Sequence, residues 1–176
     1  MFGCRNVFAL SVICFLASPV LRAETVQPPA ELSVPADCKL LCEVEAKGVQ
    51  IYKSAEGPDG KLIWVFEAPL ATLSADGKTA GWHFEGPAWV AADGSSAKKI
   101  DAKDAVTKAP APNAKADIPW LRIAIKGDEG KAGQLSNAQF VLRLNTKGGQ
   151  PPAEPPVRAG MKIGVDYTAT YSFYGK

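Results

Sequence analysis

Apolar and polar residues alternate along several segments of the chain, and the clearest examples lie in its second half. Alternation with a period of two places the apolar residues of a β-strand on one face and the polar residues on the other. Three segments show it best: Leu121, Ile123 and Ile125 oppose Arg122 and Lys126; Phe140, Leu142 and Leu144 oppose Arg143 and Asn145; Tyr167, Ala169, Tyr171 and Phe173 alternate with Thr168, Thr170 and Ser172.

Shorter apolar patterns predict further strands in the first half of the chain. They cover Leu40–Ala46, Val49–Lys53, Leu62–Ala68, Lys78–Glu85 and Ala88–Ala92. Turn signals separate them at Gly57-Pro58-Asp59-Gly60, Asp76-Gly77 and Asp93-Gly94. Asp-Gly between two strands favours a tight hairpin, because glycine adopts positive φ without steric cost.

These elements predict an all-β fold, a single antiparallel β-sandwich or barrel of about eight to nine strands. A parallel α/β fold is disfavoured because no segment shows the sustained helical period that crossover helices need. Two segments rich in Lys, Ala, Asp, Pro or Gly, Lys98–Asp117 and Lys147–Gly160, are predicted to be long surface loops. Loops of this length are either functional or poorly ordered.

The amino terminus has the organisation of a secretory signal peptide. Arg5 precedes an apolar run, Val7–Leu16, and the small residue Ala23 is suited to signal-peptidase cleavage. The alternative is a retained anchor, but the run is shorter than the roughly 20 residues that span a bilayer. We therefore expect a signal peptide at 1–23, a Pro-rich segment at 24–37 and one β domain at 38–176. The product would be exported, periplasmic or extracellular, and without a stable membrane anchor.

The charge balance excludes a polyanion-binding protein. The chain has 20 Lys and Arg against 18 Asp and Glu. Cleavage at Ala23 would remove Arg5, Arg22 and no acid, and so leave a neutral domain. Without a basic run there is no electrostatic footprint for nucleic acid or anionic lipid.

Cys38 and Cys42 are the two cysteines that follow the predicted leader. Export makes a disulfide chemically permissible. In one straight strand the two Cα atoms would lie about 13 Å apart, whereas a disulfide needs less than about 7 Å. An internal bridge would therefore require a turn between them; reduced, buried thiols and pairing between chains are the alternatives.

Five phrases in order resemble a family of secreted bacterial and fungal proteins known as domain of unknown function 3455. They are GVQIY at 48–52, HFEGPAWVAADGS at 83–95, IPWL at 118–121, RLNTKGG at 143–149 and YTATYSFY at 167–174. The resemblance implies an exported β-rich domain. It also implies a departure, because family members commonly carry one cysteine shortly after the GVQIY phrase and another after the Gly-Gly-x-x-Pro loop. This chain has Ser54 and, around Pro155–Val157, no cysteine, so it would lack a disulfide worth about 2–4 kcal/mol.

His83 is the one histidine of the chain. Alternation places Trp82 and Phe84 on one face of its strand and His83 and Glu85 on the other. If the aromatic face is the core, His83 and Glu85 form a polar pair that Asp93 and Ser95 on the next hairpin could join as a ligand or metal site. The alternative is a solvated face followed by a simple turn. No nucleophile motif accompanies the pair, and no CxxC or HxxxH spacing supports a metal.

Four tryptophans, Trp64, Trp82, Trp89 and Trp120, are a large number for a small β domain. Most are expected in the core, as the patterns around Trp64 and Trp120 suggest. Trp89 is the best candidate for an exposed, ligand-stacking position because it follows Gly86-Pro87 beside the polar residues. No GxGxxG or GxxxxGK[ST] motif supports a nucleotide cofactor.

The residues favour a non-catalytic extracytoplasmic binding or interaction module for a small molecule or an envelope component. Its candidate ligand residues are His83, Glu85, Trp89, Asp93 and Ser95, with no metal and no cofactor. The alternatives are a hydrolytic or metal-assisted enzyme built on His83, Glu85 and Asp93, and a purely structural envelope protein.

Overall fold

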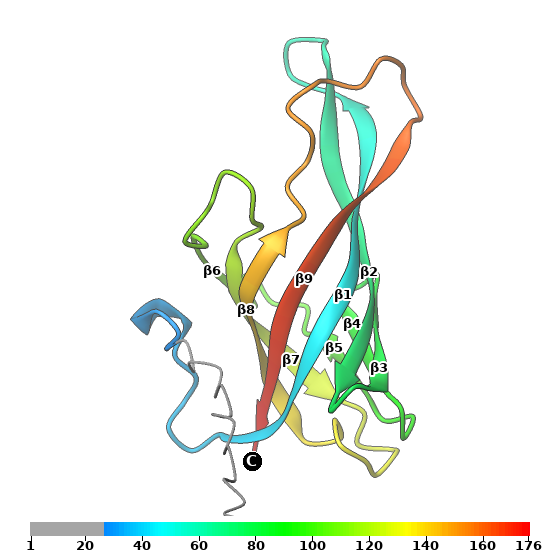
Figure 1. The fold of residues 1–176 in the computed structure, drawn as a ribbon. Helices are drawn as coiled ribbons and strands as arrows, with labels where there is room; N and C mark the ends of the chain where they lie inside the picture. Colours follow the sequence, from blue (N-terminus) through cyan, green and yellow to red (C-terminus); the bar gives the residue numbers. More distant parts are fainter. Residues whose placement is uncertain (1–26) are drawn as a thin grey trace, which may run out of the picture.

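The computed structural model describes residues 27–176, and the signal peptide predicted at 1–23 lies outside them (Figure 1). Within the described range the chain forms one 3-10 turn and nine strands, which confirms the all-β prediction. The elements are η1 (Ala30–Leu32), β1 (Lys39–Glu56), β2 (Leu62–Ala75), β3 (Lys78–Phe84), β4 (Ala88–Ala91), β5 (Ser96–Lys99), β6 (Val106–Ala109), β7 (Trp120–Gly127), β8 (Ala138–Gly148) and β9 (Lys162–Gly175). No helix between residues 27 and 176 is long and apolar enough to cross a membrane.

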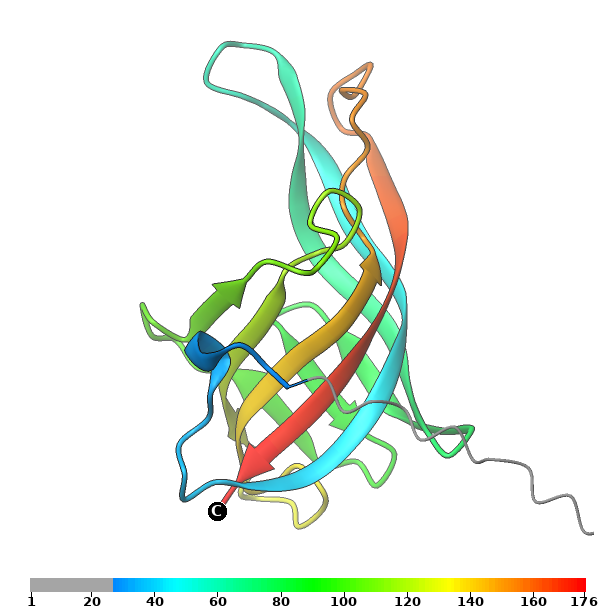
Figure 2. The same ribbon diagram turned by 60° about the vertical axis from the view of Figure 1, so that its left-hand side comes forward.

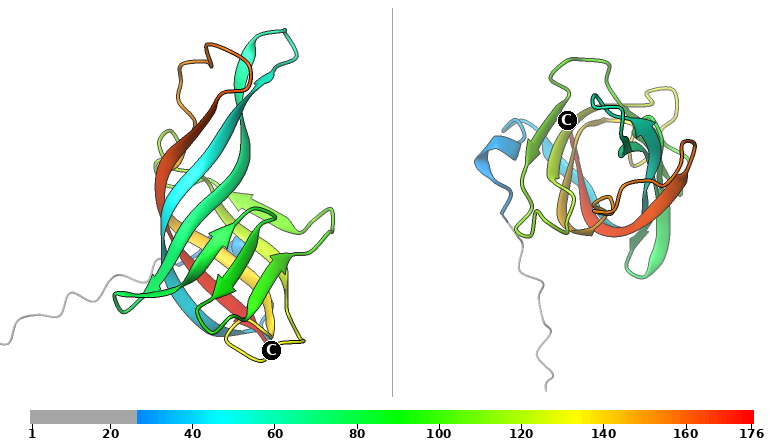
Figure 3. Two further views of the ribbon diagram at one scale, coloured as in Figure 1. Left: turned by 90° about the vertical axis from the view of Figure 1, so that its right-hand side faces the viewer. Right: turned by 90° about the horizontal axis from the view of Figure 1, so that it is seen from above.

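The strands form one antiparallel sheet that closes into a ring, as the view from above shows (Figure 3). Closure depends on β7, whose free edge pairs first with β6 and then with β5. The sequence predicts a loop over Lys98–Asp117, but β6 lies within it. Strand β6 has four residues, of which only Val106 has a large apolar side chain. Such a short segment shows no alternation that would distinguish a strand from a loop.

Tight turns join the strands where the sequence predicts them. At Asp76-Gly77, which connects β2 and β3, both residues have positive φ, 48° and 72°. Two consecutive left-handed residues define the type I′ turn, whose twist matches that of paired antiparallel strands. The turn chemistry thus sets the β2–β3 hairpin locally.

Strands β1, β2 and β9 are longer than the others and extend beyond one end of the ring (Figures 1 and 2). The extended part is tied to the chain that returns from β8. Trp64 Nε1 donates to the Glu154 carbonyl oxygen at 3.0 Å. Ser54 donates its backbone N–H to the Met161 carbonyl and accepts from the Met161 N–H at its hydroxyl. Hydrogen bonds between Ser54 and Met161 therefore join β1 to the chain before β9, at the position where the resemblance implies a cysteine in relatives.

The main core fills the ring with inward-facing residues of every long strand. The predicted apolar faces of β7 and β9 are confirmed, because Leu121, Ile123 and Ile125 are buried with the aromatic residues of β9. Trp89 packs edge-on against Tyr171 and Phe173, each at 5.9 Å between ring centroids. Edge-to-face aromatic contacts of this kind stabilise beyond the apolar area that they bury.

The alternation along β8 is present, but both of its faces are buried. Val141 and Arg143 face the inside of the ring, opposite Ile123 and Leu121 of β7. Leu142 and Leu144 face outwards and are covered by the segment around η1. Leu32 of η1 is fully buried in this second cluster, which also contains Ala109, Ala111 and Trp120. Arg122 donates to the Ser33 carbonyl and fixes the segment on the outer face.

We predict that Leu32→Ala lowers the free energy of unfolding by about 3 kcal/mol, because it opens a cavity between η1 and the outer face of β8. Urea unfolding followed by circular dichroism measures the change. Leu70→Ala is the matched control, since Leu70 is 54% exposed and its truncation should cost less than about 1 kcal/mol. Equal losses in the two variants would contradict a structural role for the segment around η1.

Candidate functional site

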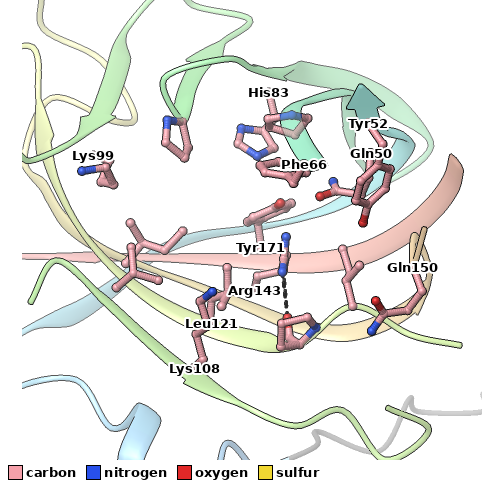
Figure 4. Close-up of a pocket in the computed structure, with 16 residues that line it drawn as sticks. Gln50, Tyr52, Phe66, His83, Lys99, Lys108, Leu121, Arg143, Gln150 and Tyr171 are labelled. Carbon is pink, nitrogen blue, oxygen red and sulfur yellow. Dashed lines mark hydrogen bonds between the residues drawn. The ribbon is translucent and has the colours of Figure 1, made fainter. Parts of the chain in front are cut away.

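A cavity of about 510 Å³ opens at the end of the ring from which the β1–β2 hairpin extends. Its wall is built by residues of β1, β2, β3, β5, β6, β7, β8 and β9 together with the chain that enters β7. Figure 4 labels ten of them: Gln50, Tyr52, Phe66, His83, Lys99, Lys108, Leu121, Arg143, Gln150 and Tyr171. At the other end of the ring the aromatic core around Trp89 and Phe173 fills the interior. The ring is therefore a cup with one open mouth.

Arg143 is the buried charge of the cup. It is 8% exposed. Its Nε and Nη2 donate to the Pro119 carbonyl oxygen at 3.2 and 2.8 Å, and the second of these bonds is drawn in Figure 4. A guanidinium has five N–H groups, and Nη1 makes no hydrogen bond within the described residues. None of the ion pairs formed within residues 27–176 includes Arg143.

Strand register places the cations of the cup in a row. Leu121 of β7 lies between Lys108 of β6 and Arg143 of β8, and Arg143 lies opposite Tyr171 of β9. Residues directly opposite one another on the same face have Cβ atoms about 5 Å apart. Lys108 and Arg143 thus face the same interior across a single leucine.

The charge of Arg143 acts on the tyrosines around it. Burial raises the pKa of Tyr52, Tyr167 and Tyr171, and the guanidinium opposes that rise in each. Tyr52 donates its hydroxyl to the Gly149 carbonyl oxygen at 2.6 Å. Gln50 Nε2 and the hydroxyls of Tyr167 and Tyr171 are buried without a hydrogen-bond partner in the described protein. The guanidinium is therefore surrounded by neutral polar groups and by no acid.

The rim of the cup is shaped by the RLNTKGG phrase. Gly148 and Gly149 have φ of 71° and 84°. A Cβ on Gly148 would lie 2.5 Å from the Asp166 carbonyl oxygen. The buried Asp117 carboxylate accepts the Gly148 N–H at 2.7 Å, and Asp117 bridges to Gly149 across the rim. The glycine pair thus lets β8 turn closely past β9 and brings the Gly149 carbonyl to Tyr52.

His83 faces the interior and is 3% exposed, whereas Trp82 is 47% exposed. The structure therefore contradicts the assignment of the aromatic face of β3 to the core, because ring closure turns the opposite face inwards. His83 Nδ1 lies 2.9 Å from the Ala88 carbonyl oxygen, so Nδ1 carries the proton and Nε2 is the free acceptor. Its ring stacks on Trp89 at 4.5 Å and 3°. Burial lowers its pKa to about 4, an effect that Arg143 reinforces.

Trp89 is fully buried, so its selection as an exposed stacking residue was wrong. The turn at Gly86-Pro87 directs β4 back into the ring, where Trp89 pairs with His83. Trp120 is buried as expected, while Phe66, which alternates with Trp64, is largely exposed and lies at the mouth of the cup.

The remaining predicted ligand residues do not join His83. Glu85 is exposed in the β3–β4 turn, and Asp93 and Ser95 lie in the β4–β5 turn at the opposite end of β4. Asp93 Oδ1 accepts from the Ser95 N–H and hydroxyl, and these bonds with that of Gln134 lower its pKa. The Ser95 hydroxyl in turn accepts the Leu135 N–H. Asp93 and Ser95 thus attach the β7–β8 loop to the β4–β5 hairpin.

Among residues 27–176 no three His, Cys, Asp or Glu side chains converge in the manner of a metal site. Cys38 and Cys42 are partly exposed free thiols. Burial, reinforced by the charge of Asp93, raises the pKa of Cys42 to about 11. Cys38 Sγ lies 3.6 Å from Gln139 Oε1.

A family model described as Protein of unknown function (DUF3455) matches residues 74–175. The chain belongs to this family. This match confirms the family resemblance seen in the sequence. The matched segment covers β3 to β9 and therefore includes His83, Arg143 and the glycine pair of the cup. No curated protein and no solved structure matches the chain.

Arg143, Gln50 and Tyr52 are site residues that the sequence analysis did not select. One signal was present for Arg143 in this DUF3455 chain. The run Phe140–Leu144 is apolar at every position except Arg143. A single charge within a strand that is apolar on both faces indicates a buried charge, and burying a charge is costly unless it is paired and hydrogen-bonded.

We predict that Gly148→Ala lowers the free energy of unfolding by about 2 kcal/mol more than Gly77→Ala. Both glycines have φ near 71°, so both substitutions carry the cost of a left-handed alanine, about 1–2 kcal/mol. Only at position 148 would the new Cβ also meet a backbone oxygen, since nothing lies within 4 Å at Gly77. Urea unfolding of both variants measures the difference, and equal losses would contradict the close approach of β8 and β9.

A second prediction concerns pH. The pKa of His83 falls from 6.5 to about 4 on folding, so the unfolded chain binds more protons between these values, and stability is lost as the pH falls through this window. Each pH unit is worth about 1.4 kcal/mol. Wild type should therefore lose about 2 kcal/mol more than His83→Gln between pH 7.5 and pH 5, by urea unfolding. Parallel losses would exclude His83 as the titrating group, since the carboxylates contribute equally to both proteins.

Proposed function

We propose that this protein is an exported binding module that holds a small molecule in the cup of its β-ring. The observation that carries the proposal is a cavity of about 510 Å³ whose wall contains a buried guanidinium without an acidic partner. Export is supported by the charge, the apolar run and the cleavage position within residues 1–23.

The size and the walls of the cup suit a small organic ligand. Ligand cavities of about 300–1,000 Å³ are lined mainly by apolar side chains with a few placed polar groups. The lining here has apolar residues such as Phe66, Leu121 and Ile123, and polar groups from Gln50, Tyr52 and Arg143. Closed rings of about eight strands are wide enough to hold one small ligand at their mouth.

Binding is favoured over hydrolysis by the groups that face the cavity. The lining residues include no serine, cysteine, aspartate or glutamate, so the cavity offers His83 no serine or cysteine nucleophile and no carboxylate to orient it. Its Nδ1 is bonded to the Ala88 carbonyl. Glu85 and Asp93, the other members of the enzyme hypothesis, lie outside the cup.

The experiment is a titration of the secreted protein with the neutral fluorescent probe N-phenyl-1-naphthylamine, whose emission rises in an apolar site. We expect saturable binding that is lost in Leu121→Trp, because the larger side chain fills the cup. Trp82→Ser is the control, since it removes an exposed apolar side chain from the outer face of β3 and should leave binding intact.

The opposite pattern, binding lost in Trp82→Ser and kept in Leu121→Trp, would place the site on the outer surface and overturn the proposal. A wild-type protein without saturable binding would do the same. N-terminal sequencing of the same preparation tests export, for which we expect the mature chain to begin at Glu24.

A further inference from the structure

The cup concentrates positive charge in a molecule that is nearly neutral. Arg143, Lys99 and Lys108 line it, and its lining contains no acid. His83 adds no charge at neutral pH because burial holds its pKa at about 4. The whole chain, by contrast, has 20 basic and 18 acidic residues. Charge of one sign inside a low-dielectric cavity focuses the electrostatic field and raises the local concentration of ions of opposite sign.

The cations differ in how far they are buried. Lys108 is exposed at the mouth, and Lys99 is partly exposed and donates from Nζ to the Ile100 carbonyl oxygen. Arg143 is almost fully buried and has only the Pro119 carbonyl as its acceptor. Taking an unpaired charge out of water is unfavourable by several kcal/mol. Among the residues that line the cavity, the fold holds this cost at Arg143.

The bonds to Pro119 also set the orientation of Arg143. Its Nε and Nη2 edge is occupied by the carbonyl. Nη1 makes no hydrogen bond among residues 27–176, and the Tyr171 hydroxyl is a polar neighbour on which the guanidinium acts. Figure 4 shows the guanidinium next to Tyr171. A guanidinium edge with two parallel N–H donors matches the two oxygens of a carboxylate.

We propose that the cup binds a small organic carboxylate with a flat apolar body, and that Arg143 receives the carboxylate. This inference rests on the proposed function. The body lies against Leu121, Ile123 and Phe66, and the carboxylate neutralises the buried charge of Arg143. Lys99 and Lys108 attract the anion towards the mouth but do not select it, because exposed charges are screened by salt.

The apolar surroundings favour an organic anion over inorganic phosphate. Leu121 separates the two cations in their row, and Ile123 and Val106 lie one row deeper. A phosphate would face these side chains without filling the space around them. A carboxylate on an aromatic or branched body would bury them as well as pair with the guanidinium.

The test compares 2-naphthoate with 2-naphthamide, which have nearly the same shape and differ in charge. Each competes with N-phenyl-1-naphthylamine at pH 7.5 and 150 mM salt. For wild type we expect at least a tenfold preference for the carboxylate, the ratio typical of a charge-assisted pair. In Arg143→Met the preference should fall to about one. Lys78→Met is the matched control, since it removes an exposed cation at the start of β3, outside the cup, and should keep the preference.

Arg143→Met also removes the bonds to Pro119, so its fold is checked by circular dichroism. If it does not fold, Arg143→Lys replaces it. Lysine keeps the positive charge but lacks the two parallel N–H donors of the guanidinium. The preference for naphthoate over naphthamide should therefore fall at least threefold. A preference that survives in the folded Arg143 variant would overturn the inference.

The other outcomes separate this inference from the proposed function. If wild type bound naphthoate and naphthamide equally, the inferred preference for an anion would be overturned, while the proposed function as a binding module would stand. If inorganic phosphate competed as strongly as naphthoate, the inference that the ligand has an organic, apolar body would be overturned. No binding of any probe, the neutral one included, would overturn the proposed function and this inference together.

Discussion

Strand β7 decides the architecture, because its outer edge pairs with β6 near one end and with β5 near the other. The two short strands together occupy an edge that would otherwise expose unpaired backbone groups, and closure removes that edge. It also decides which face of every strand points inwards. The cup, its aromatic floor and the row that contains Arg143 all follow from this pairing.

Closure makes the inside of the ring the main core, yet the ring is not sufficient by itself. The outer faces of β7 and β8 carry Trp120, Leu142 and Leu144, which would be exposed on a bare ring. The segment around η1 covers them with Leu32. Strand β8 can be apolar on both faces because its inner face packs in the interior of the ring and its outer face packs against the N-terminal segment. The segment around η1, which precedes the β strands in the sequence, therefore packs as part of the β domain.

The cup and the floor differ in the chemistry that fills them. Towards the floor, Trp89, Tyr171 and Phe173 pack edge-on and leave no room. Towards the mouth, Gln50, Arg143 and the tyrosine hydroxyls face one another with few mutual hydrogen bonds. Native proteins satisfy most buried polar groups. Among the described residues, Gln50 Nε2 and the hydroxyls of Tyr167 and Tyr171 are unpaired on this side of the core, whereas the unpaired Trp89 and Trp120 indoles lie elsewhere. The proposed ligand supplies the missing charge and the missing apolar surface together.

Local patterns predicted the elements well, because a period of two and an Asp-Gly turn depend only on neighbouring residues. The strands of the second half, the hairpin at Asp76-Gly77 and the membership suggested by the five phrases were all evident before the structure. The short strand β6 was not, since four residues carry too little pattern.

The candidate site was the weaker prediction. His83 was assigned to the face opposite the core, but it is buried inside the ring, and Trp89 was taken for an exposed residue but is fully buried. Asp93 and Ser95 proved to hold two loops together. The errors at His83 and Trp89 have the same cause: a strand with large apolar residues on both faces does not reveal which face will be enclosed. The contacts of Asp93 and Ser95 depend on the β7–β8 loop, which is distant in the sequence.

Residue order over short distances was enough to predict most of the strands, the fold class and the family, whereas the short strands β5 and β6 were not evident in it. Only the tertiary structure decided that Arg143 and His83 point inwards and share a cavity. That outcome depends on the pairing of β7 with β5 and β6, and on the register of β8 against β9, both of which join residues far apart in the chain.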